Sequence, residues 1–337
     1  MSNTLFTALH EMGLGELRGD DAWRRLVMVR NYSEVPPRSS STPLGFKFIV
    51  NNARGEPKWF GRCGWDTPAA MRNECNLLHA LTADSETARH VPEVRSVHLA
   101  ETSVQVSRHL GVPAYDQQLR TRTPAQWAAE CTEVLQLSER VLARTQATSP
   151  ALFDKDPAQA RLRQVERDLA VLGQRGVDSA MLERLQATLV GTVQELPLVL
   201  QHGDLWPANV IRANGRWWLI DFSECGLMWT PGYDLFLMLI NSPAGFDTSF
   251  LAPTGNSQQD SLSASRRQVV AQFAGRHGYS PRTMGLMLVH FLVRITAHRM
   301  RPGLSASLSE HWRAELRRLD EFLGNGGSLE RVLPGAT

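Results

Sequence analysis

Polar residues in a defined order follow the apolar run LPLVL and fill the stretch QHGDLWPANV at residues 201–210. Within this stretch His202, Asp204 and Asn209 are spaced as His-x-Asp-x-x-x-x-Asn. Core packing gains nothing from this order, because a carboxylate and an amide both need hydrogen-bond partners once they leave water. The pattern therefore predicts a functional loop directly after a buried strand.

A second carboxylate, Asp221, comes twelve residues after Asn209, at the end of NVIRANGRWWLID. Asn214-Gly215 between two apolar runs is a strong β-hairpin signal, and a tight hairpin brings its two ends together. We therefore expect Asn209 and Asp221 to lie close together, with Asp204 on the same loop. Carboxylate and amide oxygens are hard ligands suited to Mg²⁺. Phosphoryl transfer needs this set: a metal on the phosphate oxygens and a carboxylate that orients or deprotonates the attacking hydroxyl.

The same order, followed by the Asp-Phe pair in IDFSECG, matches the catalytic loop of kinases. In the form HGDLWPAN…LIDFSE…PGYDL, the chain resembles the aminoglycoside phosphotransferase family of small-molecule kinases, which share the protein-kinase-like fold. The resemblance covers most of the chain, and its specific motifs lie mainly within residues 201–235. It implies transfer of the γ-phosphoryl group of ATP, or of another nucleoside triphosphate, with Mg²⁺, to a hydroxyl of a metabolite, sugar or natural-product-like acceptor.

The resemblance also implies roles for the residues of the loop and hairpin. Asp204 would be the catalytic base, and His202 would brace the loop. Asn209 and Asp221 would ligate Mg²⁺.

Three further residues near the loop receive roles. By the resemblance, Asp234 in PGYDL is the buried aspartate that holds the catalytic loop by hydrogen bonds. Glu224 sits where the family often has a second acid, which contacts metal, water or acceptor. Trp206 lies inside the loop and either stacks on the acceptor or packs between the loop and a helix.

The nucleotide phosphates also require a cation, held by a glutamate on a helix. Glu74 in MRNECNLL fits the helix position, with a solvated helix charge as the alternative reading. Lys58 and Arg62 share one face of PKWFGRC, because strand side chains repeat every two residues. We favour Arg62, about 13 Å further along the strand, since the family's lysine comes late in it and after a small residue. An arginine here departs from the family pattern.

The rest of the nucleotide site has weaker signals. No GxGxxG is present, and SEVPPRSSSTPLG stands where a phosphate-covering loop belongs, so Ser39, Ser40 and Ser41 either contact the nucleotide or form a plain solvent loop. By the resemblance, adenine would bind to the backbone of Ser107, Arg108, His109 and Leu110.

The elements that must position these residues fall into two groups. Strand-like patterns occupy residues 24–32, 44–52, 58–63, 93–100 and 102–110, with one helix at 67–83 that begins at Thr67-Pro68. Helical patterns occupy residues 123–145, 157–176 and 178–196, and return from about 232 onward around a Ser/Gly/Gln-rich loop at 252–265. With the resemblance, this predicts an α+β, protein-kinase-like bilobal fold with a small β-rich N-lobe at 1–110 and a helical C-lobe at 111–337.

Composition narrows the partners and the compartment. The net charge of +2 is too small for nucleic acid as the main partner. The four cysteines lack metal-site spacing and are expected as reduced thiols. The apolar segment 283–300 is short and interrupted by His290 and Arg294, so it predicts a buried helix and no membrane partner. Without a signal-peptide pattern, we expect a cytoplasmic protein, and the oligomeric state stays open.

The acceptor is constrained only by charge. Polycationic aminoglycosides need a strongly acidic pocket, whereas the C-terminal half mixes acids with many arginines. We expect its acids Glu310, Glu315, Asp320 and Glu321 on solvated faces of the last helix. A neutral or anionic acceptor is therefore favoured, such as a sugar, a nucleoside, an amino alcohol or a natural-product intermediate.

Other functions are weighed against this one. A catalytically weak or silent nucleotide-binding regulator is the main alternative, because Arg62 stands where the family has lysine. A metal-dependent hydrolase would need further His or Asp ligands at regular spacing, and a protein kinase would need the glycine loop and an APE-like segment.

Overall fold

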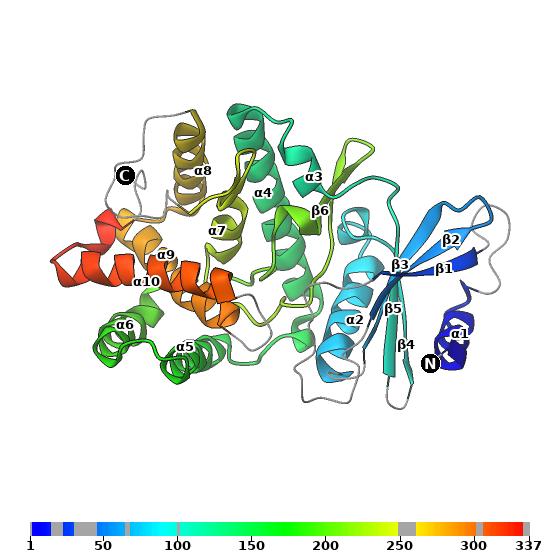
Figure 1. The fold of residues 1–337 in the computed structure, drawn as a ribbon, viewed down its shortest axis with the longest axis horizontal. Coiled ribbons are helices and arrows are strands. Elements are labelled where there is room, and N and C mark those ends of the chain that lie inside the picture. The colour runs from blue at the N-terminus through cyan, green and yellow to red at the C-terminus, as the bar shows by residue number, and fades with distance from the viewer. Residues whose placement is uncertain are drawn as a thin grey trace.

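The computed structural model describes residues 2–14, 23–29, 46–64, 68–99, 102–248, 261–300 and 306–332. A sheet-bearing N-lobe lies at one end of the molecule and a larger helical C-lobe at the other (Figure 1). The predicted α+β bilobal architecture is confirmed. The predictions for Ser39–Ser41, for Thr67 and for residues 252–260 lie outside the described residues. The rest of the predicted loop, residues 261–265, belongs instead to the helix α8 (Ser261–His277), so that part of the prediction was wrong.

The N-lobe is built on a sheet that, within the described residues, has five strands in the order β1-β2-β3-β5-β4. Every neighbouring pair is antiparallel. The strands are β1 (Trp23–Val29), β2 (Phe46–Asn52), β3 (Pro57–Gly64), β4 (Val94–Leu99) and β5 (Thr102–Arg108). Each of them overlaps one of the five strands predicted from the sequence.

One face of this sheet is buried under a helix that the sequence reasoning missed. The helix α1 (Ser2–Glu11) places Leu5 and Leu9 in a cluster with Phe48 and Trp59 of the sheet. We expected one helix in the N-lobe and find two within the described residues, so that expectation was wrong. The apolar spacing at residues 5, 8, 9 and 12 was the available signal.

The opposite face of the sheet carries polar side chains. Lys47 on β2 lies directly across from Arg62 on β3, and Arg62 lies across from Gln105 on β5. The helix α2 (Pro68–Ala83) contacts β4 and β5 and carries Glu74. The alternation of strand side chains therefore separates an apolar face under α1 from a charged face beside α2.

The C-lobe is a helical assembly around one large apolar cluster. Its helices are α3 (Tyr115–Leu119), α4 (Pro124–Thr148), α5 (Pro157–Gln174), α6 (Ser179–Thr192), α7 (Tyr233–Leu239), α8 (Ser261–His277), α9 (Pro281–Arg299) and α10 (Ala306–Gly324). Short 3₁₀ turns are η3 (Thr87–Arg89), η4 (Pro150–Leu152), η5 (Val193–Glu195), η6 (Pro207–Asn209) and η8 (Leu329–Arg331). The side chain of Thr123 caps α4 in a capping box with Gln126, so this helix begins where the sequence predicts.

The apolar segment near residue 290 forms α9, which is buried along most of its length. Within the described residues, no helix has the length and apolar content needed to cross a bilayer. On α10, Glu315 is only 3% exposed and accepts a hydrogen bond from Thr248 Oγ1 (2.7 Å). The expectation that Glu315 lies on a solvated face was therefore wrong, because its side chain turns toward the chain that follows α7.

Two small hairpins complete the C-lobe. β6 (Val210–Ala213) pairs with β7 (Arg216–Leu219), and β8 (Asn241–Ser242) pairs with β9 (Gly245–Phe246). Asn214 and Gly215 both have positive φ, as the predicted two-residue turn requires. The β6–β7 hairpin begins at Asn209 and leads to Asp221, so it connects the two parts of the candidate site.

Candidate active site

Asn209 joins the loop that contains Asp204 to the hairpin that leads to Asp221. Its side-chain amide donates hydrogen bonds to the backbone carbonyl (2.8 Å) and to the carboxylate (2.9 Å) of Asp204. The backbone carbonyl of Asn209 accepts a hydrogen bond from the N–H of Ile220 (3.0 Å). The hairpin therefore returns the chain so that Asp221 lies beside the loop.

Two cavities meet at this point. An interlobe cavity of about 240 Å³ is lined by residues of the charged sheet face and of the hairpin, among them Lys47, Arg62, Glu74, Gln105 and Asp221. A C-lobe cavity of about 350 Å³ is lined by residues of the loop and of α9, among them Asp204, Trp206, Glu224, Arg294 and Arg299. Ala208 and Asn209 line both. The loop thus separates two spaces of small-molecule size.

Asp221 faces the interlobe cavity from a strained backbone position. Its φ is 58°, in the left-handed region that costs a non-glycine residue about 1 kcal/mol, although aspartate tolerates it better than most. Its carboxylate accepts a hydrogen bond from Ser223 Oγ (2.8 Å) and lies 3.6 Å from the guanidinium of Arg62. Burial alone would raise the pKa of Asp221, but Arg62, Ser223 and Lys47 outweigh it and hold the pKa below its ordinary value. The carboxylate is therefore ionised and able to bind a cation.

Asp204 faces the C-lobe cavity and has the opposite tendency. Burial, with the negative charge of Asp221 as the next cause, raises the pKa of Asp204 to about 6. Its hydrogen bond from Asn209 works against this rise. A carboxylate with a raised pKa is a stronger base, which suits it to accept a proton from a hydroxyl group.

Asp234, in the first turn of α7, holds the loop in place through hydrogen bonds to its backbone. Its carboxylate accepts hydrogen bonds from the backbone N–H groups of His202 (2.7 Å) and Gly203 (3.0 Å). Gly203 has φ +83°, and a Cβ atom there would lie 2.7 Å from the carbonyl oxygen of Glu224, so only glycine fits. Burial raises the pKa of Asp234 to about 7, although both backbone donors favour its ionised form. The loop is thus fixed by a side chain 32 residues away in the chain.

His202 contributes packing, and its ring does not reach either cavity. The side chain is fully buried and its ring centroid lies 4.5 Å from that of Phe222. Burial lowers the pKa of His202 to about 4, so the ring is neutral at neutral pH. Its position agrees with a bracing role and excludes direct contact with a reacting group in this conformation.

Arg62 is the cation of β3 that faces the interlobe cavity. It forms an ion pair with Glu74, and its Nε and Nη2 both donate to Gln105 Oε1 (3.1 Å each). Glu74 is 4% exposed, so it is not a solvated helix charge. Of the two candidates weighed from the sequence, Arg62 is therefore the one that reaches the helix glutamate.

Lys58 lies elsewhere, and a different lysine faces the cavity. The ammonium of Lys58 pairs with Glu56 at the β2–β3 turn (3.4 Å) and does not line the interlobe cavity. Lys47 does line it, and its charge lowers the pKa of Asp221. The sequence reasoning missed Lys47, although pairing the two strands across the NNARGEP turn would have placed it opposite Arg62.

The segment expected to hold adenine reaches the cavity at one residue. Ser107 lines the interlobe cavity, whereas Arg108, His109 and Leu110 are half-buried and lie outside its lining. The N–H of His109 already donates to the carbonyl of Lys58 (2.8 Å). Recognition by the backbone of all four residues would therefore require a local rearrangement.

Two residues predicted near the loop lie in the wall of the C-lobe cavity. The carboxylate of Glu224 is 3.6 Å from the guanidinium of Arg294 on α9. The ring of Trp206 is half-buried and lies under the guanidinium of Arg299, 5.2 Å from its centroid. Trp206 thus both lines the C-lobe cavity and packs between the loop and α9, so both readings of its role stay open.

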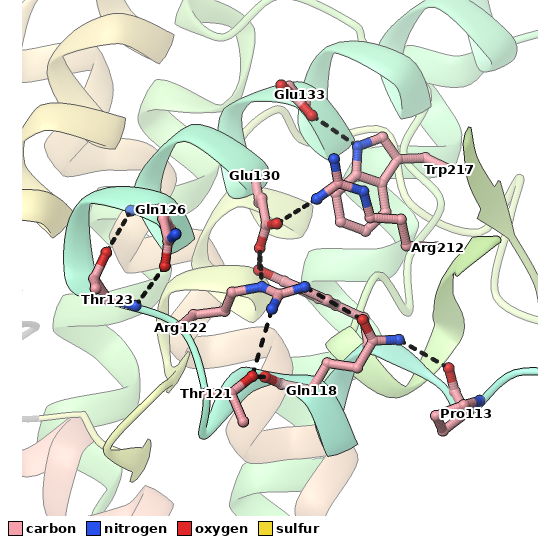
Figure 2. A network of polar contacts seen from close by, with 11 residues as sticks. Pro113, Gln118, Thr121, Arg122, Thr123, Gln126, Glu130, Glu133, Arg212 and Trp217 are labelled. Carbon is pink, nitrogen blue, oxygen red and sulfur yellow. Dashed lines mark hydrogen bonds and ion pairs between the residues drawn. The ribbon is translucent and has the colours of Figure 1, made fainter. Parts of the chain in front are cut away.

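A buried carboxylate on α4 ties the hairpin to the segment that connects the lobes. Glu130 accepts hydrogen bonds from Tyr115 (2.7 Å), Arg122 (2.9 Å) and Arg212 on β6 (2.5 Å). Figure 2 shows Glu130 between Arg122 and Arg212, with Trp217 of β7 beside the latter. The hairpin strands therefore have a fixed position relative to α4, which in turn positions Asn209 and Asp221 at their ends.

The oxygen ligands at the site fit a magnesium ion that is shared with phosphate groups. Within the described residues, no three His, Cys, Asp or Glu side chains converge as a metal site. Asn209 and Asp221 offer one amide oxygen and one ionised carboxylate on the interlobe cavity. Mg²⁺ commonly takes one or two such protein ligands and completes its shell with water and substrate phosphates.

Comparison with known proteins agrees with this geometry. Residues 60–269 match the sequence model of the phosphotransferase enzyme family, APH. No curated protein matches the chain in sequence.

Several solved structures are similar in fold. The ADP-bound aminoglycoside phosphotransferase APH(2'')-Ib shares 12% identity over 96% of this chain and 98% of its own, with a TM-score of 0.53. The choline kinase of Cryptosporidium parvum Iowa II shares 12% identity over 93% and 92%, with a TM-score of 0.55. The GDP and kanamycin complex of APH(2'')-IIIa shares 16% identity over 94% and 99%, with a TM-score of 0.54.

Proposed function

We propose that this protein, which belongs to the phosphotransferase enzyme family, transfers the γ-phosphoryl group of ATP to a hydroxyl of a small molecule. The observation that carries the proposal is the position of Asn209. It lines both cavities and lies between Asp221 on the interlobe side and Asp204 on the C-lobe side. A donor and an acceptor in the two cavities would meet across this residue.

On the interlobe side, the residues are suited to a nucleotide. Lys47 and Arg62 project from neighbouring strands and supply positive charge for the phosphates. Asn209 and Asp221 would hold Mg²⁺, which when bound neutralises charge on the β- and γ-phosphate oxygens. Apolar side chains of this cavity, including Leu78, Val94 and Leu219, offer a surface for the base. The ADP and GDP in similar structures support a nucleoside triphosphate as donor.

On the C-lobe side, Asp204 would act on the acceptor. The acceptor hydroxyl oxygen bonds to the γ-phosphorus as the bond from that phosphorus to the β–γ bridging oxygen breaks. The hydroxyl proton passes to the Asp204 carboxylate, and the nucleoside diphosphate leaves with the electron pair of the broken bond. We propose in-line transfer without a covalent enzyme intermediate, in which Asp204 acts as the base on the acceptor hydroxyl.

Two further assignments belong to this proposal. We place the boundary between the lobes at residue 110, between β5 and α3. All four cysteines are free thiols, which supports a reducing compartment such as the cytoplasm.

A panel of hydroxylated metabolites tests the function. Release of ADP or GDP is measured with each acceptor and each nucleotide, using wild type and Asp204→Ala. Acceptor-dependent release by wild type alone supports the kinase. Nucleotide binding without release for any acceptor would instead support a silent nucleotide-binding regulator, the alternative raised because Arg62 stands where the family has lysine.

A further inference from the structure

We infer that the acceptor carries an anionic group, a carboxylate or a phosphate monoester, in addition to its hydroxyl, and that Arg299 binds this group. The inference rests on the proposed function, because it takes the C-lobe cavity as the acceptor site. It concerns the substrate class, which the loop and hairpin do not specify.

The other arginine in the cavity wall is already neutralised. Arg294 on α9 is buried, donates a hydrogen bond to Asp168 (2.9 Å) and lies 3.6 Å from Glu224. Two carboxylates thus flank one guanidinium. Glu224 is consequently engaged within the protein and does not present a free negative charge for a cationic acceptor.

Arg299 is different. It is the last residue of α9, and within the described residues no carboxylate forms an ion pair with it. Its Nε is buried and has no hydrogen-bond partner in the described part of the chain. Its guanidinium lies over the ring of Trp206, 5.2 Å from the centroid, which holds the planar group in one orientation. An oriented arginine with free donors matches the two oxygens of a carboxylate or phosphate.

The charge of Asp204 determines how the acceptor is oriented in the cavity. Asp204 lies at the loop, where a hydroxyl must approach, and its carboxylate repels an anionic group there. The anionic group therefore belongs at Arg299 and the hydroxyl at Asp204. A polyamine would instead place a positive charge beside Arg299, which forms no ion pair within the described residues and interacts with Asp204 only at longer range. The volume of about 350 Å³ accommodates a small molecule such as a hydroxy acid or a phosphorylated polyol.

Matched acceptors and matched variants test this assignment. The acceptors are D-glycerate, sn-glycerol 3-phosphate, neutral glycerol and cationic choline. The proteins are wild type, Arg299→Gln and the control Arg282→Gln, which removes an exposed arginine at the other end of α9 that pairs with Glu195. Binding of each acceptor is measured by calorimetry in the presence of a non-hydrolysable ATP analogue, and turnover is measured by ADP release.

We expect wild type and Arg282→Gln to bind at least one anionic compound, and Arg299→Gln to bind it roughly tenfold more weakly, as loss of one charge-assisted contact predicts. The ATP KM should be unchanged in both variants. If Arg299 had only a structural role, its replacement would be expected to change the ATP KM as well. Comparison of glycerate with glycerol 3-phosphate separates a carboxylate from a phosphate group.

Two results would overturn the inference. One is binding of glycerol or choline with neither anion bound. The other is an equal loss for charged and neutral acceptors in Arg299→Gln. In either case, the kinase function is still supported if wild type turns over an acceptor and Asp204→Ala does not. Anion binding that depends on Arg299 without any turnover would retain the binding site and reject the kinase function.

Discussion

The guanidinium of Arg62 reaches from the sheet to the hairpin, where its Nη1 lies 3.6 Å from Oδ1 of Asp221. The pair joins a strand of the N-lobe to the carboxylate that we propose as a metal ligand. The same guanidinium is paired with Glu74, so one cation lies between two carboxylates. In the proposed function, Asp221 would hold Mg²⁺ and Arg62 would contact the phosphates. Replacement of Asp221 therefore tests whether its carboxylate binds a metal ion.

Replacement Asp221→Asn should abolish the magnesium-dependent part of ATP binding. Asparagine tolerates positive φ, so the backbone at 221 is preserved while the negative charge is lost. ATP titrations with Mg²⁺ and with EDTA measure the effect. Asp154→Asn, at an exposed ion pair, serves as the control. Equal magnesium dependence in wild type and Asp221→Asn would exclude Asp221 as a ligand.

Replacement Asp204→Ala should lower kcat about 10²- to 10⁴-fold, the range for loss of a general base, and leave ATP affinity nearly unchanged. Asp204 lines the C-lobe cavity and not the interlobe cavity, which is why nucleotide binding should persist. Steady-state ADP release and ATP calorimetry test the two parts separately. A variant with the wild-type rate would show that another group takes the proton.

Replacement Lys47→Met should raise the ATP KM roughly tenfold, whereas Lys58→Met should change it less than twofold. The two lysines form a matched pair. One lines the interlobe cavity beside Asp221, and the other pairs with Glu56 at a turn. The ATP KM of each variant is measured by steady-state kinetics over a range of ATP concentrations. A larger effect at Lys58 would contradict the assignment of Lys47.

Replacement Glu130→Gln should reduce the free energy of unfolding by about 1–3 kcal/mol, because Glu130 accepts hydrogen bonds from two arginines and a tyrosine in a largely buried position. Since one of these arginines lies on β6, kcat should fall as well. Urea denaturation and ADP release measure both quantities. Glu139→Gln, on the same helix with partly exposed partners, should show little change. An unaffected Glu130→Gln variant would remove the network from the account of site positioning.

His290 should make the protein less stable as the pH falls. Burial, with Arg161 as the second cause, lowers the pKa of His290 to about 3, whereas an unfolded histidine has a pKa near 6.5. The unfolded chain therefore takes up a proton first. Stability is lost from about pH 6.5 down to about pH 3, at about 1.4 kcal/mol per pH unit for this group.

The variant His290→Gln isolates this contribution. Urea denaturation gives the free energy of unfolding of both proteins between pH 7 and pH 5. The value for wild type minus the value for the variant should fall by about 2 kcal/mol over this interval. A constant difference over this interval would show that the pKa of His290 is the same in the folded and the unfolded chain.

Much of the loop and hairpin could be predicted because its parts are close in the chain. His202, Asp204 and Asn209 lie within eight residues, and the Asn214-Gly215 turn brings Asp221 back to them. Such local geometry follows from turn chemistry and strand alternation, which the residue types determine. The family resemblance depended on the same local order, and it is confirmed by the match over residues 60–269.

Charge pairing between distant segments was decided only by the tertiary structure. Arg294 meets Asp168 across 126 residues, and this contact leaves Arg299 as the arginine of the cavity without a carboxylate partner in the described chain. The burial of Glu315 and the position of Lys47 depend in the same way on which faces pack together. A sequence records which residues are charged. Which of those charges are neutralised depends on contacts between segments far apart in the chain, and these exist only once the lobes are packed.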